Sequence, residues 1–417
     1  MIRALLCVLL LAALARAGDT PDTSLAQEVE NYLDEVQGGS EDPTTFRAFW
    51  KEGLRLETSD GSFRLKIFGM FQWDSHWRSS SDFSGDVTDD GTLFRRVRAG
   101  FEGVAYRNME FKIQLDFAKG TTALRDAYLG LLNLPVVGTF RAGQFFEPFG
   151  LEAQTSAKYT TFIERATPSD TFAPSRNTGF MLANAHAEGR VTWAIGIFRD
   201  TDDQGAVAED GGYAMTVRIT TLPLRDDEAG RLVHLGVAFS LRDPNGETLR
   251  FQARPGTGSG PRLVDTSDFA ADELVLVGFE FAVVWRAFSV QAEAFLADAT
   301  GGAGAPDPSF SGFYVEVSWF VTGERRAYKG SVISRTKPHR NFHNAAGPGA
   351  WQVAFRFDSL DLTDGSIVGG EQETLTFGVN WHWNPNARVM FNVVLADVDG
   401  PSAGEITIFQ TRFAVDF

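Results

Sequence analysis

From Phe63 onward, hydrophobic and polar residues alternate along most of the chain. Residues 109–117 show the pattern most clearly, because every odd position is apolar and the even positions are Glu, Lys, Gln and Asp. Residues 213–220, 351–358 and 375–383 repeat it. Successive side chains of a β-strand point to opposite faces of its sheet. Each segment therefore predicts a strand with one apolar and one polar face.

Sixteen such segments follow one another, and an even number places both ends of the series on the same side of a sheet. A soluble β-sandwich also shows alternation, so the period alone leaves that fold open. The predicted strands are 63–75, 93–106, 109–118, 125–132, 138–146, 179–187, 190–198, 213–221, 232–242, 272–285, 288–298, 310–320, 350–360, 373–383, 387–397 and 405–417.

Three further features favour a membrane barrel over a sandwich. The apolar faces carry large aromatic residues, often near strand ends, and the chain closes on the aromatic Phe417. The connections also alternate between tight turns and long polar stretches, as in outer-membrane barrels with short periplasmic turns and longer external loops. The tight joins lie at 107–108, 188–189, 286–287 and 384–386, and the long ones near 76–92, 147–178, 199–212, 243–271 and 361–372.

We therefore predict an all-β protein: a single transmembrane antiparallel β-barrel of about 16 strands over residues 61–417. A barrel of this size is wide enough for a water-filled channel. Two segments do not fit the scheme. The join at 321–349 should be a periplasmic turn but is long and basic, and residues 54–58 look like a small extra strand.

The first 60 residues divide into two parts. Residues 1–17 read as a signal peptide, with Arg3, an apolar run and a small-x-small cleavage site. Residues 18–60 are interpreted as a periplasmic extension in which 24–36 could form a short amphipathic helix, with a disordered linker as the alternative.

Composition narrows the possible functions. The 417 residues carry a formal net charge of −16, which argues against nucleic acid as a partner. The mean hydropathy of −0.13 is too polar for a helical membrane protein. Cys7, the only cysteine, lies in the predicted signal peptide, so we expect neither disulfides nor a thiolate site.

Several segments in succession resemble the phosphate-selective porin O and P family. The resemblance covers roughly 60–417 and implies a sixteen-stranded barrel, usually a homotrimer, in which anions pass along a row of arginines and lysines. The segments that carry it are 93–103, 111–117, 124–128, 143–151, 162–166, 176–179, 321–325 and 377–381.

Arg95 and Arg96 match the paired arginines of the family. Guanidinium suits phosphate because its fork of donors binds two oxygens and stays charged. Strict alternation directs Arg96 and Arg98 into the lumen and Arg95 toward lipid, which would cost about 2–4 kcal/mol at the membrane midplane. Arg95 is therefore turned inward by a bulge, or it lies near the rim and pairs with a carboxylate such as Glu102.

The stretch 147–178 should fold into the lumen and narrow it, with Lys158, Arg165 and Arg176 as its basic candidates. The alternative for Arg165 is a local ion pair with the adjacent Glu164. Arg254 lies with Arg250 and Arg262 in the fifth external loop, where the family has a denser arginine run; a solvated surface loop is the alternative for all three.

Two positions depart from the family. Met70 replaces an inward arginine next to Gln72, and Ala153 replaces a central lysine. Losing two cations from a confined row weakens anion binding, because confined charges are screened little. We therefore expect a pore for small anions, possibly phosphate, or for small polar solutes.

Neither a catalytic nor a metal site is expected. The six histidines lack metal-ligand spacing. His234 and His382 are interpreted as polar-face residues, and Glu110, Asp116 and Glu293 as solvated wall. The sequence thus predicts a passive outer-membrane porin without enzyme activity or cofactor. The alternative is a non-conducting barrel or secreted β-protein that serves as an adhesin or scaffold.

Overall fold

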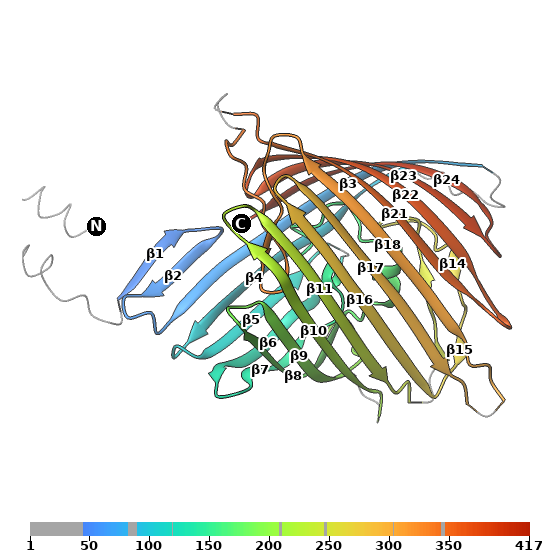
Figure 1. The fold of residues 1–417 in the computed structure, drawn as a ribbon. Coiled ribbons are helices and arrows are strands. Elements are labelled where there is room, and N and C mark those ends of the chain that lie inside the picture. Colours follow the sequence, from blue (N-terminus) through green and yellow to red (C-terminus); the bar gives the residue numbers. More distant parts are fainter. Residues whose placement is uncertain are drawn as a thin grey trace, which may run out of the picture.

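The chain folds into a closed antiparallel β-barrel (Figure 1). The computed structural model describes residues 45–81, 90–118, 120–207, 211–245, 248–302, 304–342 and 347–417. The predicted signal peptide and the possible helix at 24–36 lie outside the described residues.

Sixteen strands form the barrel wall, and all sixteen predicted strands are confirmed. Each pairs antiparallel with the next along the chain, and β24 pairs with β3 to close the ring, with Phe413 opposite Trp73. The strands are β3 (Arg64–Ser81), β4 (Gly91–Ala105), β5 (Met109–Asp116), β6 (Ala123–Leu134), β7 (Gly138–Phe146), β8 (Arg176–His186), β9 (Val191–Arg199), β10 (Tyr213–Asp226), β11 (Arg231–Arg242), β16 (Glu273–Trp285), β17 (Phe288–Thr300), β18 (Ser309–Phe320), β21 (Ala350–Asp364), β22 (Ile367–Asn384), β23 (Ala387–Asp399) and β24 (Gly404–Asp416).

The two faces of the wall differ as the alternation predicts. On β22, Leu375, Phe377 and Val379 are exposed on the outside, whereas Thr376 and Asn380 are buried on the inside. Because an exposed apolar belt is stable only against lipid, the outer face is the membrane-facing one. None of the helices in the described part of the chain is long and apolar enough to span a membrane.

The prediction of an external loop at 361–372 is wrong. β21 continues to Asp364, a tight turn follows, and β22 begins at Ile367. The alternation persists there, with Leu360 and Leu362 buried inside the barrel and Asp361 on the outside. Most outward positions in this segment are polar, with Val368 as the exposed exception, so it lacks the continuous apolar outer face by which membrane strands were identified.

A short hairpin extends the wall at the periplasmic end, the end where the C-terminus lies. β1 (Phe46–Trp50) pairs with β2 (Leu54–Thr58), and β2 pairs with the first residues of β3. Figure 1 shows the hairpin projecting from the rim of the barrel. The extra strand at 54–58 is thus present, and the described part of the extension is β-structure attached to the barrel.

Three connections fold into the lumen. The loop 147–175 carries the two short helices α3 (Leu151–Gln154) and α4 (Thr167–Phe172). The external loop that follows β11 pairs β12 (Thr248–Leu249) with β15 (Phe269–Ala270) and β13 (Gln252–Ala253) with β14 (Val264–Asp265). The periplasmic turn that follows β18 forms a hairpin of β19 (Ala327–Lys329) and β20 (Val332–Ser334).

An apolar core fills the extracellular half of the lumen against β16–β24. Phe251 and Val264 of the external loop and Phe172 of α4 pack there against inward-facing residues such as Phe295 and Ile408. The open space is therefore displaced toward β3–β9.

Candidate functional site

The loop 147–175 is fastened to the wall by a buried carboxylate. Glu293 of β17 accepts the backbone N–H groups of Leu151 at 2.6 Å and Glu152 at 2.8 Å, and the hydroxyl of Tyr314 at 2.5 Å. Glu293 is only 3 % exposed. A buried carboxyl group that accepts three hydrogen bonds holds the loop rigidly.

Two glycines of the wall make room for phenyl rings of this loop. A Cβ atom at Gly278 would lie 3.0 Å from the ring of Phe149, and one at Gly378 would lie 3.0 Å from the ring of Phe162. Both rings are fully buried. The loop therefore lies directly on β16 and β22.

Buried arginines of the wall bind the far end of the loop. Arg356 donates to the carbonyl of Glu164 at 3.1 Å, and Arg388 donates to the carbonyl of Thr160 at 2.8 Å. Arg412 donates to the carboxylate of Glu164 at 2.8 Å. Arginines from three strands thus hold the loop on one side of the barrel, and the passage lies on the other.

Three cavities that share lining residues follow that passage. Two outer cavities, of about 430 and 120 Å³, lie at the extracellular end. An inner chamber of about 370 Å³ lies toward the periplasm, between the loop and β3–β8. Arg176 lines both the larger outer cavity and the chamber, and Arg165 lines both the smaller outer cavity and the chamber. These two guanidinium groups mark the junction.

The inner chamber is strongly cationic although the chain is acidic. Eight basic side chains and two carboxylates line it. The basic side chains are Lys66, Arg96, Arg98, Lys112, Arg141, Lys158, Arg165 and Arg176, and the carboxylates are Glu102 and Asp126. A confined concentration of one sign of charge attracts ions of the other sign.

Both junction arginines lie against one phenyl ring. The guanidinium carbons of Arg176 and Arg165 are 3.9 and 5.7 Å from the ring centre of Phe146. Arg176 donates to Asp126 at 2.8 Å. Arg165 donates to the backbone carbonyls of Glu152, Ala153 and Thr155, each at 3.1 Å. The proposed local pair of Arg165 with Glu164 is therefore wrong.

Arg95 is turned inward by a bulge, one of the two arrangements expected for it. Gln72 pairs with Arg96 and Trp73 pairs with Phe94, so Arg95 is the extra residue. Its guanidinium donates to both oxygens of Glu164, at 2.8 and 3.0 Å. The alternative pair with Glu102 is wrong, because Glu102 faces Lys66 and Lys112. Although burial alone would raise it, Arg95 and Arg412 lower the pKa of Glu164.

Arg96 and Arg98 both point into the chamber, as alternation predicts. Arg96 donates to the neutral side-chain oxygen of Gln72 at 2.8 Å, whereas Arg98 donates to Asp116 at 2.7 Å. Arg96 thus has a neutral hydrogen-bond partner, whereas the charge of Arg98 is partly compensated by a direct ion pair.

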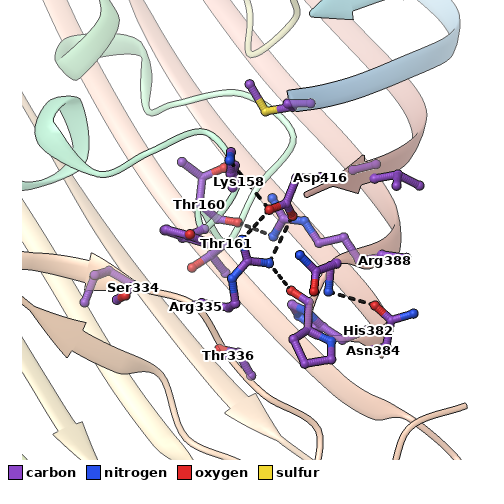
Figure 2. A pocket seen from close by; sticks show the side chains of 18 of the residues that line it. Lys158, Thr160, Thr161, Ser334, Arg335, Thr336, His382, Asn384, Arg388 and Asp416 are labelled. Atoms are coloured by element: carbon purple, nitrogen blue, oxygen red, sulfur yellow. Dashed lines mark hydrogen bonds and ion pairs between the residues drawn. The ribbon is translucent and has the colours of Figure 1, made fainter. Parts of the chain in front are cut away.

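Lys158 lies at the periplasmic end of the loop and lines the chamber. Its ammonium group is 3.6 Å from Asp416, and Asp416 also binds Arg335 of the periplasmic turn (Figure 2). Burial lowers the pKa of Lys158 to about 8, although Asp416 acts in the opposite direction. Its charge therefore changes within an accessible pH range.

Arg254 lines the smaller outer cavity and donates to the carbonyl of Gly260 at 2.8 Å. The segment as a whole is not a solvated surface loop, because Phe251 and Val264 are buried in the lumen, but Arg250 and Arg262 are exposed, as that alternative expects. Arg250 is the more exposed member and pairs with Asp265.

Two of the three residues interpreted as solvated wall, Asp116 and Glu293, are buried, and so is the polar-face residue His234. His234 is fully buried between Glu280, at 3.0 Å, and the hydroxyl of Tyr328, at 2.8 Å. Tyr328 belongs to the β19–β20 hairpin, so the long join at 321–349 covers this part of the wall. Asp116 is buried beside Arg98, and Glu293 is buried under the loop 147–175.

His382 is half-buried, and Glu110 pairs with Arg141 at 3.0 Å. Within the described ranges, no group of three or more His, Cys, Asp or Glu side chains could hold a metal ion.

Sequence reasoning missed several cations of the passage. Lys66, Lys112 and Arg141 line the chamber, and Arg125 lines the larger outer cavity. Lys112 lies on the polar face of the clearest predicted strand, which was the signal that could have identified it. The ion pairs of Arg141 and Arg125 join residues distant in sequence.

Comparison with known proteins gives a consistent result. Residues 66–417 match the model of the family described as phosphate-selective porin O and P. A protein of Pseudomonas aeruginosa named Porin O is 25 % identical over 395 residues, which cover 84 % of this chain and 86 % of that protein. An uncharacterised protein of Caulobacter vibrioides is 27 % identical over 376 residues, covering 84 % of this chain and 72 % of that one.

Solved structures share the fold at low sequence identity. An anion-selective porin from Comamonas acidovorans is 10 % identical with a TM-score of 0.55, covering 85 % of this chain and all of that one. The trimer form of OmpT, an outer-membrane protein of Vibrio cholerae, is 11 % identical with a TM-score of 0.53 and equal coverage.

Proposed function

Because the chain belongs to the phosphate-selective porin O and P family, we propose that it conducts small anions passively along the cavities on the β3–β9 side of its lumen. Fold and family together identify an outer-membrane porin. What we propose beyond that is the path, its residues and its preference.

The single observation that carries the proposal is the charge of the inner chamber. Eight basic groups against two carboxylates line it, and two guanidinium groups stand at its entrance. Selectivity in a pore follows from charged side chains at its narrow part. We assign entry to Arg165 and Arg176, with Arg254 and Arg95 on the extracellular side and Arg96, Arg98 and Lys158 on the periplasmic side.

The preference for phosphate over other small anions is proposed to be weak. The replaced lysine position, Ala153, has the guanidinium of Arg165 at its carbonyl, so a cation is still supplied there. Met70, at the replaced arginine position, lines the chamber without charge. Ion pairs such as Arg98–Asp116 further reduce the charge available to a solute.

We also propose a homotrimer without enzyme activity, cofactor or nucleic-acid partner. The trimer form of the Vibrio cholerae porin and the family resemblance support the assembly. The titratable groups of the lumen support the lack of catalysis, because they are taken up in holding the inserted segments. Glu293 and His234 are examples, each buried against one of these segments.

Single-channel recording in planar bilayers tests the function. The purified protein should give discrete conductance steps, and reversal potentials under a salt gradient should show a preference for anions. A scaffold or adhesin would give no steps. A preference for cations would contradict the assignment of the chamber as the selective region, and block of chloride current by phosphate would measure the phosphate preference.

A further inference from the structure

One buried guanidinium at the periplasmic end of the lumen joins four separate segments of the chain. Arg335 of the periplasmic turn is 6 % exposed, and it donates to the carboxylate of Asp416 in β24 at 3.1 Å and to the carbonyl of Pro385 between β22 and β23. Its guanidinium carbon lies 5.2 Å from the ring centre of Tyr159, in the loop that carries α3 and α4. Its Nε atom lies 3.8 Å from the carboxylate of Glu52, at the tip of the β1–β2 hairpin. The channel loop, the C-terminal strand and the N-terminal hairpin therefore meet at Arg335.

The tip of the hairpin holds a carboxylate at this place. The hairpin is fixed to the rim by the pairing of β2 with β3, and Trp50 at the end of β1 stacks on Phe417, with ring centres 6.3 Å apart. Glu52 follows with a φ of 55°, in the left-handed region that favours glycine, so a side chain there costs stability. Its carboxylate faces Arg335 and also Lys337, whose ammonium group lies 3.2 Å away. These ion pairs give a physical reason for a charged residue in this turn.

The charges along this series of contacts alternate in sign as far as the inner chamber. Glu52 lies beside Arg335, and Arg335 binds Asp416. Asp416 in turn lies 3.6 Å from the ammonium group of Lys158, which lines the chamber (Figure 2). Two further charged groups act on Lys158 from neighbouring strands, namely Lys66 of β3 and Glu102 of β4.

Each member of this series should act on the protonation of Lys158 with the sign of its own charge. A nearby carboxylate favours the charged form of a lysine, and a nearby cation disfavours it. Glu52 offsets part of the charge of Arg335. It should therefore act on Lys158 in the same direction as Asp416, and Arg335 should act in the opposite direction.

We propose that Arg335 is a positioning residue that links the N-terminal hairpin to the inner chamber, so that attachment of the hairpin through Glu52 helps to keep Lys158 charged and the chamber selective for anions. Arg335 acts through Asp416 and need not contact the passing ion. The inference rests on the proposed function, because Lys158 is assigned there to the path of the anion. It gives the β1–β2 hairpin a role in conduction: release of the hairpin from the rim lowers the positive charge of the chamber.

Single substitutions test the order of the charges. The quantity measured is the midpoint, the pH at which half of the decline in anion preference has occurred. Asp416→Asn should lower the midpoint by about one pH unit or more, because it removes the nearest opposite charge. Glu52→Gln should lower it by less, and Arg335→Gln should raise it, whereas Arg335→Lys keeps the charge and should stay close to the intact protein. A merely structural cluster would not shift the midpoint in opposite directions for Glu52→Gln and Arg335→Gln.

A double variant tests whether the hairpin acts through Arg335. Added to Arg335→Gln, the substitution Glu52→Gln should shift the midpoint no further, because the group through which Glu52 acts is already gone. Glu57→Gln is the matched control, since Glu57 belongs to the same hairpin and lies opposite Arg47 of β1. Equal shifts by Glu52→Gln and Glu57→Gln, or an undiminished shift by Glu52→Gln in the double variant, would overturn the link.

Two readouts separate this inference from the channel function. Reversal potentials in planar bilayers over a series of pH values give the midpoint of the anion preference. Nuclear magnetic resonance of the folded protein with ¹³C-dimethylated lysines follows the titration of Lys158 itself, whose signal is the one absent from Lys158→Arg. If the lysine signal shifts as stated but the channel does not prefer anions, the link holds and the proposed function fails. If the channel prefers anions but neither readout responds to Glu52→Gln or Arg335→Gln, the link is wrong and the proposed function holds.

Discussion

Substitution of Arg165 by glutamine should reduce the anion preference of the channel at low salt. Arg165 lies at the junction between an outer cavity and the chamber. Its hydrogen-bond partners are backbone carbonyls, so it forms no direct ion pair within the described residues. Glutamine is planar and can keep part of this bonding. The main change is then the loss of one positive charge beside the path.

The expected size follows from Coulomb's law. In a water-filled pore, the guanidinium stabilises a monovalent anion passing at about 5 Å by about 0.8 kcal/mol. It destabilises a monovalent cation at the same distance by the same amount. Screening at 0.1 M salt lowers this to about 0.5 kcal/mol. The ratio of anion to cation permeability should therefore fall about fivefold at 0.1 M, and by less than about twofold at 1 M.

Reversal potentials in planar bilayers under a salt gradient measure this ratio. Arg165→Lys should retain most of the preference, because it keeps the charge. Arg325→Gln serves as the control, since Arg325 is an exposed arginine of the periplasmic turn bonded to the carbonyl of Asp227. If Arg165→Gln leaves the ratio unchanged at 0.1 M, or if Arg325→Gln lowers it equally, the junction has been assigned wrongly.

Three further predictions concern other parts of the passage. Arg96→Ala should lower anion preference while Lys329→Ala leaves it unchanged, and equal reversal potentials for the two would contradict the position of the chamber. Anion preference should decline between about pH 7 and 9, because Lys158 is charged below its pKa of about 8 and neutral above it. Lys158→Arg should abolish this decline, because arginine stays charged. A decline that persists in Lys158→Arg would show that another group causes it. Glu293→Ala should leave donors of the loop 147–175 unsatisfied, which destabilises the bound loop by about 1–3 kcal/mol per group. Both conductance and current noise should then rise. Unchanged single-channel records would show that other contacts hold the loop.

The barrel could be predicted from the sequence because its wall obeys one local rule. A strand between lipid and water must alternate, so the sixteen wall strands were found, with bounds that mostly agree within a few residues. Alternation does not identify a strand where neither face of that strand contacts lipid. The segment 361–372 has mostly polar outward residues and was taken for a loop, although β21 and β22 extend through it.

The site was only partly predictable, because its geometry comes from segments that fold back into the lumen. Arg96, Arg165 and Arg176 were identified as candidates, and the structure places all three in the chamber. The partners of Arg95 and Arg165 were not foreseen. Arg95 pairs with Glu164, 69 positions away, and such a pairing leaves no trace in local sequence.

The net charge of −16 therefore says little about which ions pass. Many carboxylates of the lumen are bound: Glu293 accepts backbone donors of the loop, and Asp116 and Asp126 compensate Arg98 and Arg176. A paired arginine contributes little field at a distance, because its carboxylate cancels it. Arg96 and Arg165 have neutral hydrogen-bond partners, so no direct ion pair in the described part of the chain cancels their charge. Selectivity in this barrel should thus depend on the few cations held by neutral groups, and counting all basic residues of the row would overestimate the affinity for phosphate.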